Sequence, residues 1–335
     1  MKLGLVLPYE GSFSLAESVD LTRAAESLGY DSVWMPEAWG TDAVSVLGAL
    51  AASTDRIKLG TGILNVFSRT PALLGQTAAT LDALSGGRFI LGLGTSGHQV
   101  VAGWHGVPFD RPLQRMRETI EIVRQVVRRQ PLRFEGEVFK LGQGLKLLSH
   151  PVRTEIPIFL ATLTPAGLRL TGELADGWMP TMFSPAHVGL LRHDLEQGAK
   201  ASGRELQALE IAPTVPLVID DDAGRARNAV RSWVALYVGG MGSPAKNYYN
   251  QTALRYGFKE ARQIQDLYLS GKRLEAVAAV PDALIDAVAI AGPESTVRDR
   301  LAAFRESGVT TLAVMPFAAD GPGRRRALEA LAAAA

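Results

Sequence analysis

Short apolar runs rich in β-branched residues alternate along the chain with longer segments in which apolar residues recur at helical spacing. The first four runs are Leu3–Leu7, Asp31–Met35, Ile57–Ile63 and Phe89–Leu93. Their starts recur about every 30 residues, which is the length of one strand-plus-helix unit. Runs that are apolar on both faces predict parallel strands whose outer surfaces are covered by helices.

The same alternation continues through the second half of the chain. Further strands are predicted near residues 156–161, 177–180, 209–219 and 310–315, and helices near 165–175, 185–202, 293–307 and 321–334. Helices near 15–28 and 42–53 follow the first two strands. This alternation favours an α/β fold, the (β/α)8 TIM barrel. A doubly wound open sheet is the structural alternative.

The helix after the third strand is expected to bury one apolar stripe, because its apolar residues fall on one face. The members of that stripe are Leu73, Leu74, Thr77, Leu81 and Leu84.

Residues 220–286, between the seventh and eighth predicted strands, interrupt the alternation of strands and helices. Their sequence is polar and helical. They contain the glycine-rich run Gly239–Gly242 and the pair Tyr248-Tyr249. An insertion on this face of a barrel usually forms a lid or a substrate wall. A helical excursion that extends a dimer interface is the alternative. We therefore predict a single domain spanning residues 1–335, with a helical insertion at about 220–286 between strands 7 and 8.

Charge and residue content exclude several classes of protein. Lys and Arg total 35 against 34 Asp and Glu, so the net charge is +1 and nucleic acid is not an expected partner. No Cys is present, which excludes disulfides, thiolate metal ligands and Cys nucleophiles. The five histidines show no metal-binding spacing, and no apolar stretch has the length of a membrane span. We expect a cytoplasmic protein that binds no metal and no membrane.

In a barrel of this kind the active site lies at the carboxyl ends of the strands. The residues that follow the predicted strands are rich in glycine, small hydroxyls and flat apolar groups, and poor in charge. Such a surface suits a planar aromatic ligand better than a phosphosugar or a metal ion. A small molecule is therefore the expected binding partner.

Three segments and one histidine among these strand ends each have a functional and a structural interpretation. The glycines of Gly60–Ile63 and Gly92–Gly97 let a ligand approach the backbone, or they form tight turns; the spacing of a dinucleotide-binding motif is absent. Thr162-Leu163-Thr164-Pro165 predicts a capped helix start that can hold a phosphate, or an ordinary cap. His98 follows a strand directly and is either a proton donor or a structural side chain.

Taken together, the strand ends resemble the luciferase-like superfamily of flavin- and F420-dependent oxidoreductases, which includes methylenetetrahydromethanopterin reductase. The segments that carry the resemblance span nearly the whole chain: Leu3–Leu5, Gly29–Trp34, Glu37–Ala43, Leu59–Ile63, Leu84–Phe89, Gly92–Gly94, Ala175–Trp178, Gly292–Glu294 and Ser307–Val309. The resemblance implies a TIM barrel that holds coenzyme F420, a deazaflavin, and uses it for hydride transfer. It also implies a homodimer.

The resemblance assigns roles to individual residues near the cofactor. It implies a cis peptide between Gly62 and Ile63 against the central ring, and it places Glu37 near the deazaflavin head. Thr95 and Ser96 match the site along the cofactor side chain. The resemblance also implies that the loop of Thr162, Leu163 and Thr164 binds the cofactor phosphate.

Two departures concern the acid–base groups. Relatives that oxidise alcohols or sugar phosphates often have a His where this chain has Ala38, and a Glu where it has Gly97. Sugar-phosphate dehydrogenation is therefore not expected. Glu37 and His98 remain as candidate catalytic residues, and Trp39 is expected to shape the pocket.

Further candidate wall residues, for which packing is the alternative, are Tyr9, Glu10, Trp104, Tyr237 and Asn247. The leading hypothesis is an F420-dependent oxidoreductase acting on a small or medium apolar carbonyl, alcohol or conjugated double bond. The alternatives are an FMN-dependent luciferase-like monooxygenase and a non-catalytic F420-binding protein.

Overall fold

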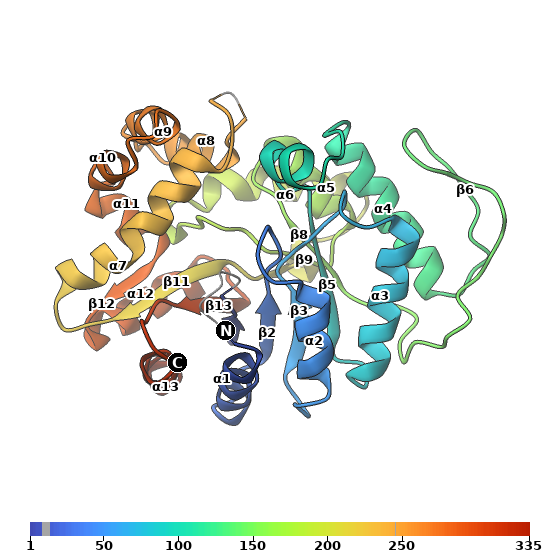
Figure 1. Ribbon diagram of the computed structural model, residues 1–335, viewed down its shortest axis with the longest axis horizontal. Coiled ribbons are helices and arrows are strands. Elements are labelled where there is room, and N and C mark those ends of the chain that lie inside the picture. The colour runs from blue at the N-terminus through green and yellow to red at the C-terminus, as the bar shows by residue number, and fades with distance from the viewer. Residues whose placement is uncertain (9–13, 245) are drawn as a thin grey trace. The chain divides into compact units, whose positions relative to one another are not determined.

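Parallel strands alternate with helices over much of the computed structural model, which describes residues 1–8, 14–244 and 246–335 (Figure 1). The elements of the first half are β1 (Lys2–Val6), α1 (Leu15–Ser27), β2 (Ser32–Met35), α2 (Ala43–Ala51), β3 (Lys58–Thr61), β4 (Leu64–Asn65), α3 (Pro71–Leu84), β5 (Phe89–Gly94), the π-helix η1 (Gln99–Trp104), α4 (Pro112–Val127), β6 (Phe134–Glu135), β7 (Lys140–Leu141) and β8 (Ile158–Ala161).

The second half begins at the helix that follows β8. Its elements are α5 (Pro165–Leu174), β9 (Gly177–Trp178), the 3-10 helix η2 (Pro185–His187), α6 (Gly189–Ala201), the 3-10 helix η3 (Leu206–Ala208), β10 (Glu210–Ile211), β11 (Thr214–Ile219), α7 (Ala223–Ala235), the π-helix η4 (Leu236–Gly240), α8 (Tyr248–Arg255), α9 (Ala261–Leu269), α10 (Arg273–Ala278), α11 (Asp282–Val288), β12 (Ile290–Gly292), α12 (Glu294–Glu306), β13 (Thr311–Pro316) and α13 (Gly321–Ala334).

The chain divides into two compact units. The larger unit comprises residues 4–179 and 194–210, and the second comprises residues 1–3, 180–193 and 211–335. In the larger unit β1, β2, β3, β5, β8 and β9 pair in parallel in that order. In the second unit β11 pairs in parallel with both β12 and β13. The organisation as one domain with an inserted segment stays a prediction.

The parallel strands of the larger unit are mostly buried on both faces, as their sequences predict. All six residues of β5 are buried, as are all four of β2. Trp34 and Trp178 are fully buried, and each indole N–H has a partner: Trp34 donates to the Ser32 hydroxyl at 3.0 Å and Trp178 donates to the Thr162 carbonyl at 2.9 Å.

Helix starts follow the capping chemistry of the sequence. Ser14 and Glu17 form a capping box at α1, and the Asp42 carboxylate accepts from the Ser45 amide at the start of α2. Thr70 caps α3, which opens with Pro71. These polar residues therefore fix the point at which the chain turns from a strand end into a helix.

The prediction of one continuous third strand over residues 57–63 was wrong. The segment is divided into β3 and β4, and β4 continues the pairing with β5. The cause is Thr61, whose hydroxyl donates to the Gly92 carbonyl at 2.8 Å and accepts from the Gly92 amide at 2.7 Å. A side chain thus takes the place of a strand neighbour, and hydrophobic periodicity carries no signal for that.

Other short strands were also missed. The segment 209–219 is divided into β10 and β11, and β12, which follows the predicted insertion, pairs with β11. Helices α7 to α11 lie between residues 223 and 288, in agreement with the polar helical pattern. A three-residue strand directly before a Gly-Pro turn is too short for periodicity to detect.

The predicted stripe of α3 was wrong at two positions. Leu74 and Leu81 are buried, but Leu73 and Leu84 are 46% and 59% exposed. The buried face contains Gly75, where a Cβ atom would lie 2.6 Å from Val126 of α4. Small residues let α4 approach closely, so the contact face of α3 is not the face with the largest apolar side chains.

A hairpin formed by β6 and β7 extends beyond α3 and α4 at the edge of the larger unit (Figure 1). The buried carboxylate of Glu118, on α4, holds the hairpin tip by accepting from the amides of Glu137, Val138 and Phe139 at 2.8 to 3.2 Å. Gln114 donates to the same carboxylate at 2.9 Å. One acidic side chain therefore anchors the hairpin.

Candidate active site

The segments predicted to bind the cofactor lie in the larger unit, at the carboxyl ends of four parallel strands. Glu37 follows β2, Gly62 and Ile63 connect β3 to β4, Thr95 and Ser96 follow β5, and the segment 162–164 follows β8. β2, β3, β5 and β8 are neighbours in the sheet. The structure therefore brings these segments to the same end of one sheet.

The glycines at these strand ends are explained by internal packing. A Cβ atom at Gly60 would lie 2.2 Å from the Trp34 ring, and one at Gly94 would lie 2.6 Å from the Ile63 side chain. One at Gly92 would lie 1.9 Å from the Thr61 carbonyl oxygen. The peptide between Gly62 and Ile63 is cis, in agreement with the resemblance. The missing side chains make room for Ile63 and Trp34.

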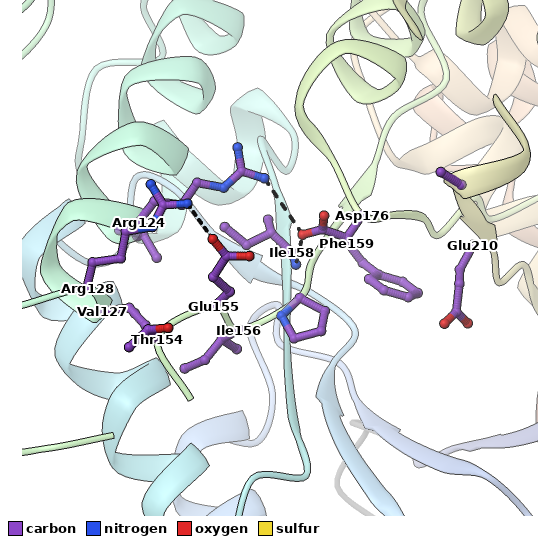
Figure 2. Close-up of a pocket in the computed structure, with 13 residues that line it drawn as sticks. Arg124, Val127, Arg128, Thr154, Glu155, Ile156, Ile158, Phe159, Asp176 and Glu210 are labelled. Atoms are coloured by element: carbon purple, nitrogen blue, oxygen red, sulfur yellow. Dashed lines mark hydrogen bonds and ion pairs between the residues drawn. The ribbon is translucent and has the colours of Figure 1, made fainter. Parts of the chain in front are cut away.

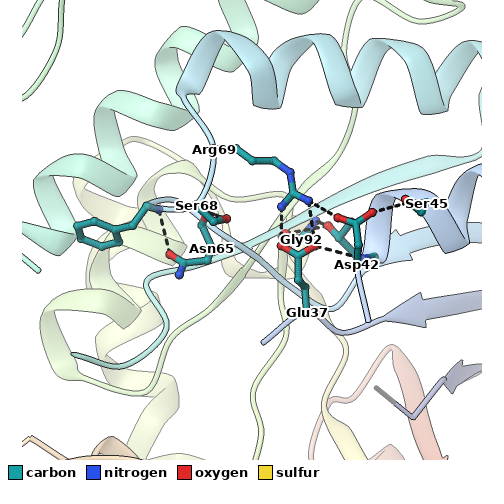
Figure 3. A network of polar contacts seen from close by, with 10 residues as sticks. Glu37, Asp42, Ser45, Asn65, Ser68, Arg69 and Gly92 are labelled. Atoms are coloured by element: carbon teal, nitrogen blue, oxygen red, sulfur yellow. Dashed lines mark hydrogen bonds and ion pairs between the residues drawn. The ribbon is translucent and has the colours of Figure 1, made fainter. Parts of the chain in front are cut away.

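Glu37 is enclosed in a network of charged groups that the sequence did not predict (Figure 3). Arg69 donates to both of its carboxylate oxygens, at 2.5 and 2.9 Å, and the amide of Ala43 donates to one of them at 3.1 Å. Arg69 also donates to Asp42 at 2.6 Å. The Glu37 and Arg69 side chains are only 12% and 16% exposed. Glu37 is therefore a carboxylate with an enclosed cationic partner.

The pKa values around Arg69 follow from these contacts. The hydrogen bond to Glu37 raises the pKa of Arg69, because it outweighs the loss of hydration. For Asp42, burial raises the pKa, but the bonds from Ser45 and the charge of Arg69 outweigh it, so the net pKa is lowered. Both groups are thus held in their charged forms.

The segment after β5 presents a row of backbone N–H groups. Ser96 adopts a left-handed conformation, with φ at 56°. Among the described residues, the amides from Thr95 to His98 have no hydrogen-bond acceptor. Successive amides around a left-handed residue can bind an anion or a carbonyl oxygen. This geometry is compatible with the predicted role of Thr95 and Ser96.

The segment after β8 is partly occupied by internal contacts. The Thr162 and Thr171 hydroxyls are 2.7 Å apart, and the Thr164 hydroxyl accepts from the Gly167 amide at 3.1 Å as the cap of α5. Leu163 is half-buried. The Ala166 amide has no acceptor within the part of the chain that the structure describes. That amide and the Thr164 O–H are the donors that could reach a phosphate.

The other predicted residues differ in their surroundings. His98 is exposed, and within the described ranges its ring has no hydrogen-bond partner; its centroid lies 6.2 Å from that of the Phe109 ring. Trp39 and Trp104 are 45% and 65% exposed, in the segments after β2 and β5. Large exposed indoles next to strand ends are available to contact a ligand.

The chain matches the family model described as luciferase-like monooxygenase over residues 1–311. It belongs to the luciferase-like family. A Mycobacterium tuberculosis protein provisionally named coenzyme F420-dependent oxidoreductase is 39% identical over 334 residues, covering 96% of each chain. The 5,10-methylenetetrahydromethanopterin reductase of Archaeoglobus fulgidus is 30% identical over 315 residues, covering 92% of this chain and 91% of the relative.

A solved structure of the luciferase-like family agrees with this assignment. The coenzyme F420-dependent tetrahydromethanopterin reductase of Methanopyrus kandleri superposes with a TM-score of 0.85 at 27% identity, covering 99% of this chain and 97% of the other. The fold class is the TIM-barrel α/β fold, as predicted from strand alternation.

Two candidate wall residues of this luciferase-like protein lie in the second unit. Tyr237 is half-buried and its ring packs against Trp233 at 4.3 Å. Asn247 is buried as the cap of α8: its oxygen accepts from the amides of Tyr249 and Asn250, and its nitrogen donates to the Tyr237 and Val238 carbonyls. The Asn247 amide is thus fully engaged within the protein. Tyr9 and Glu10 lie outside the described residues.

A cavity of about 370 Å³ lies at the opposite end of the same strands, near the amino end of β8 (Figure 2). Its charged lining groups are paired: Arg128 with Glu155 at 2.8 Å, and Arg124 with Asp176 at 3.7 Å. No predicted site residue lines it. In TIM barrels of this kind, residues at the amino end support stability rather than catalysis.

The described ranges, residues 1–8, 14–244 and 246–335, contain neither a metal-binding cluster nor a membrane-spanning helix. No cluster of His, Asp and Glu there could hold a metal ion. No helix in that part of the chain combines the length and the apolar character that crossing a membrane requires.

Proposed function

We propose that this protein is a coenzyme F420-dependent oxidoreductase that transfers a hydride between F420 and a small or medium apolar carbonyl, alcohol or conjugated double bond. The named relatives support the cofactor and the reaction class. The substrate class follows from the low charge of the strand ends. Glu37, the acidic residue closest to the end of β2, already forms an ion pair with Arg69.

The observation that carries this proposal is the row of unpaired amides from Thr95 to His98 beside Ile63 and its glycines. A planar cofactor with a phosphorylated side chain needs a flat apolar support and donors to its oxygens. Ile63, packed on Gly94, offers the flat apolar support, and the amides offer the hydrogen-bond donors. The Ala166 amide and the Thr164 hydroxyl offer donors to a phosphate at a helix start. The residues present therefore fit coenzyme F420.

When bound, F420 supplies a two-electron hydride carrier. The protein then orients the substrate and moves a proton. Trp39 and Trp104 are placed to exclude water from an apolar substrate, because both indoles are exposed beside strand ends. His98 is the proposed proton donor, since its ring has no hydrogen-bond partner among the described residues whereas the Glu37 carboxylate is enclosed.

The cofactor assignment is tested by titrating the purified protein with F420 and with FMN while recording absorbance. We expect F420 to bind more tightly. Tighter binding of FMN, together with oxygen consumption when reduced FMN is supplied, would instead support the second candidate, an FMN-dependent monooxygenase. The family model's description favours that second candidate. Tight F420 binding without turnover on any carbonyl or alkene would identify a non-catalytic F420-binding protein.

His98→Ala is expected to lower kcat by about 100-fold at saturating F420, because a positioned general acid contributes roughly that factor or more. His105→Ala is the matched control, as His105 lies just beyond η1 in the same segment. Stopped-flow absorbance of F420 oxidation with a panel of apolar carbonyls measures both variants. Equal losses in the two variants would show that His98 has no specific role.

Cytoplasmic location and a homodimer remain part of this proposal. Analytical ultracentrifugation tests the second of them directly.

A further inference from the structure

One side chain, that of Arg69, bonds to both ends of the segment 37–42. Arg69 donates to Glu37 at the beginning of this segment and to Asp42 at its end. Trp39 lies between the two carboxylates in the sequence and is 45% exposed. Figure 3 shows the Arg69 guanidinium between Glu37 and Asp42. One guanidinium therefore closes a short loop that carries an exposed indole.

Arg69 itself is placed by the segment that begins at Ile63. β4 ends at Asn65, whose side-chain oxygen accepts from the Phe67 amide at 2.9 Å. The Ser68 hydroxyl donates to the Asn65 carbonyl at 2.9 Å. These local bonds form a turn that leads directly from β4 to Arg69. The position of Arg69 is thus linked through this turn to the Ile63 segment.

The geometry of the Arg69–Glu37 pair favours a permanent ion pair over a carboxylate that exchanges protons. A bidentate Arg–carboxylate pair fixes both groups in a plane, and enclosure from water strengthens it. The Ala43 amide at the start of α2 adds a third donor to Glu37. A carboxylate held by three donors has little freedom to approach a substrate.

We propose that Arg69 is a positioning residue of the cofactor site, which fixes the Trp39 loop relative to the Ile63 segment through Glu37 and Asp42. In this role Glu37 is an anchored carboxylate and not the proton donor. The inference rests on the proposed function for the identity of the cofactor, but the state of the loop can be measured without any cofactor.

Loss of Arg69 has two physical effects. It removes the bonds that close the loop, and it leaves two carboxylates facing each other without a cation, so that they repel. Both effects release the loop that carries Trp39. A displacement of about 1 Å in a positioning group can cost orders of magnitude in a site that orients two reactants.

The first test uses acrylamide quenching of Trp39 fluorescence, with Trp39→Phe versions of each protein to subtract the other tryptophans. Arg69→Gln is expected to make Trp39 more accessible, and Arg69→Lys is expected to restore part of the protection. The matched control is Arg117→Gln, which breaks another bidentate pair, Arg117 with Glu173, between α4 and α5. This control should leave Trp39 as it is in the wild type.

The second test measures the dissociation constant of F420 by absorbance titration. Arg69→Gln is expected to raise it roughly 10-fold or more, while Arg117→Gln changes it less than about 2-fold. Glu37→Gln should also raise it, and the double variant should be no weaker than Arg69→Gln alone. Thermal melting of all variants shows whether a loss of affinity is only a loss of folded protein.

The outcomes separate the positioning role of Arg69 from the identity of the cofactor. Unchanged quenching of Trp39 in folded Arg69→Gln and Arg69→Lys overturns the positioning role. Equal losses in Arg69→Gln and Arg117→Gln overturn it as well, because they show a general effect on stability. Failure of the wild type to bind F420, with the quenching difference present, overturns the proposed cofactor and leaves the loop anchor supported. Loss of one limb of the kcat pH profile in Glu37→Gln would identify Glu37 as an acid–base group and overturn its anchored role.

Discussion

Gly92→Ala is expected to lower the free energy of unfolding by about 3 kcal/mol, because overpacking a closed site costs roughly that much when nothing can yield. The new Cβ atom would lie 1.9 Å from the Thr61 carbonyl oxygen, which is backbone and cannot rotate away. The Thr61 hydroxyl also bonds the Gly92 amide and carbonyl, so any shift of β5 breaks those two bonds.

Urea unfolding followed by circular dichroism measures this effect. Gly48→Ala is the control, because Gly48 lies inside α2 and no atom lies within 4 Å of the position of a new Cβ. Alanine there should raise the free energy of unfolding by about 0.5–1 kcal/mol. A Gly92→Ala protein within about 1 kcal/mol of the wild type would contradict the described packing of β5 against Thr61.

Glu118→Gln is expected to lower the free energy of unfolding by about 3 kcal/mol at neutral pH, because hydrogen bonds to a buried charge are worth about 1.5–3 kcal/mol each. The new amide nitrogen would face the amides of the hairpin tip, which are donors as well. The control is Glu135→Gln, whose exposed pair with Lys140 should contribute less than about 1 kcal/mol.

The effect of Glu118→Gln should depend on pH in a defined direction. Burial raises the pKa of Glu118, but the bonds from Gln114 and the hairpin amides outweigh it, so the pKa is lowered in the folded state. The stability that Glu118 contributes is present above its unfolded pKa and is lost as pH falls through the folded pKa. The difference between wild type and variant should therefore shrink below about pH 4. A difference that grows in acid would contradict this account.

The alternation of strands and helices was predictable because burial on both faces of a parallel strand leaves a continuous apolar run in the sequence. Helix starts were predictable from residues such as Thr164 and Pro165, whose chemistry acts within a few positions. The division of β3 from β4 was not predictable. It depends on the Thr61 hydroxyl meeting Gly92, 31 residues away.

In the candidate site, too, contacts between residues far apart in the sequence were not predictable. Strand order placed the segments that follow strands at one end of the sheet, and the family resemblance then assigned cofactor roles to Thr95, Ser96 and Thr162. Arg69 was missed, because its role comes from Glu37 across a distance of 32 residues and an Arg after a short strand has no distinctive pattern. Asn247 was named as a wall residue, although an Asn before a helical segment is the usual signal of a cap, which is what it forms.

The arrangement of Ile63 has a consequence for redesign of this protein. Its side chain fills the space that a side chain at Gly94 would need, and it lies 3.3 Å from the position of a Cβ atom at Gly92. The Thr61 hydroxyl in turn holds Gly92 through the Gly92 amide. These four positions therefore form one steric unit. An engineer who wants a wider or narrower support for a different ring cannot exchange Ile63 by itself, and has to search combinations at all four positions together.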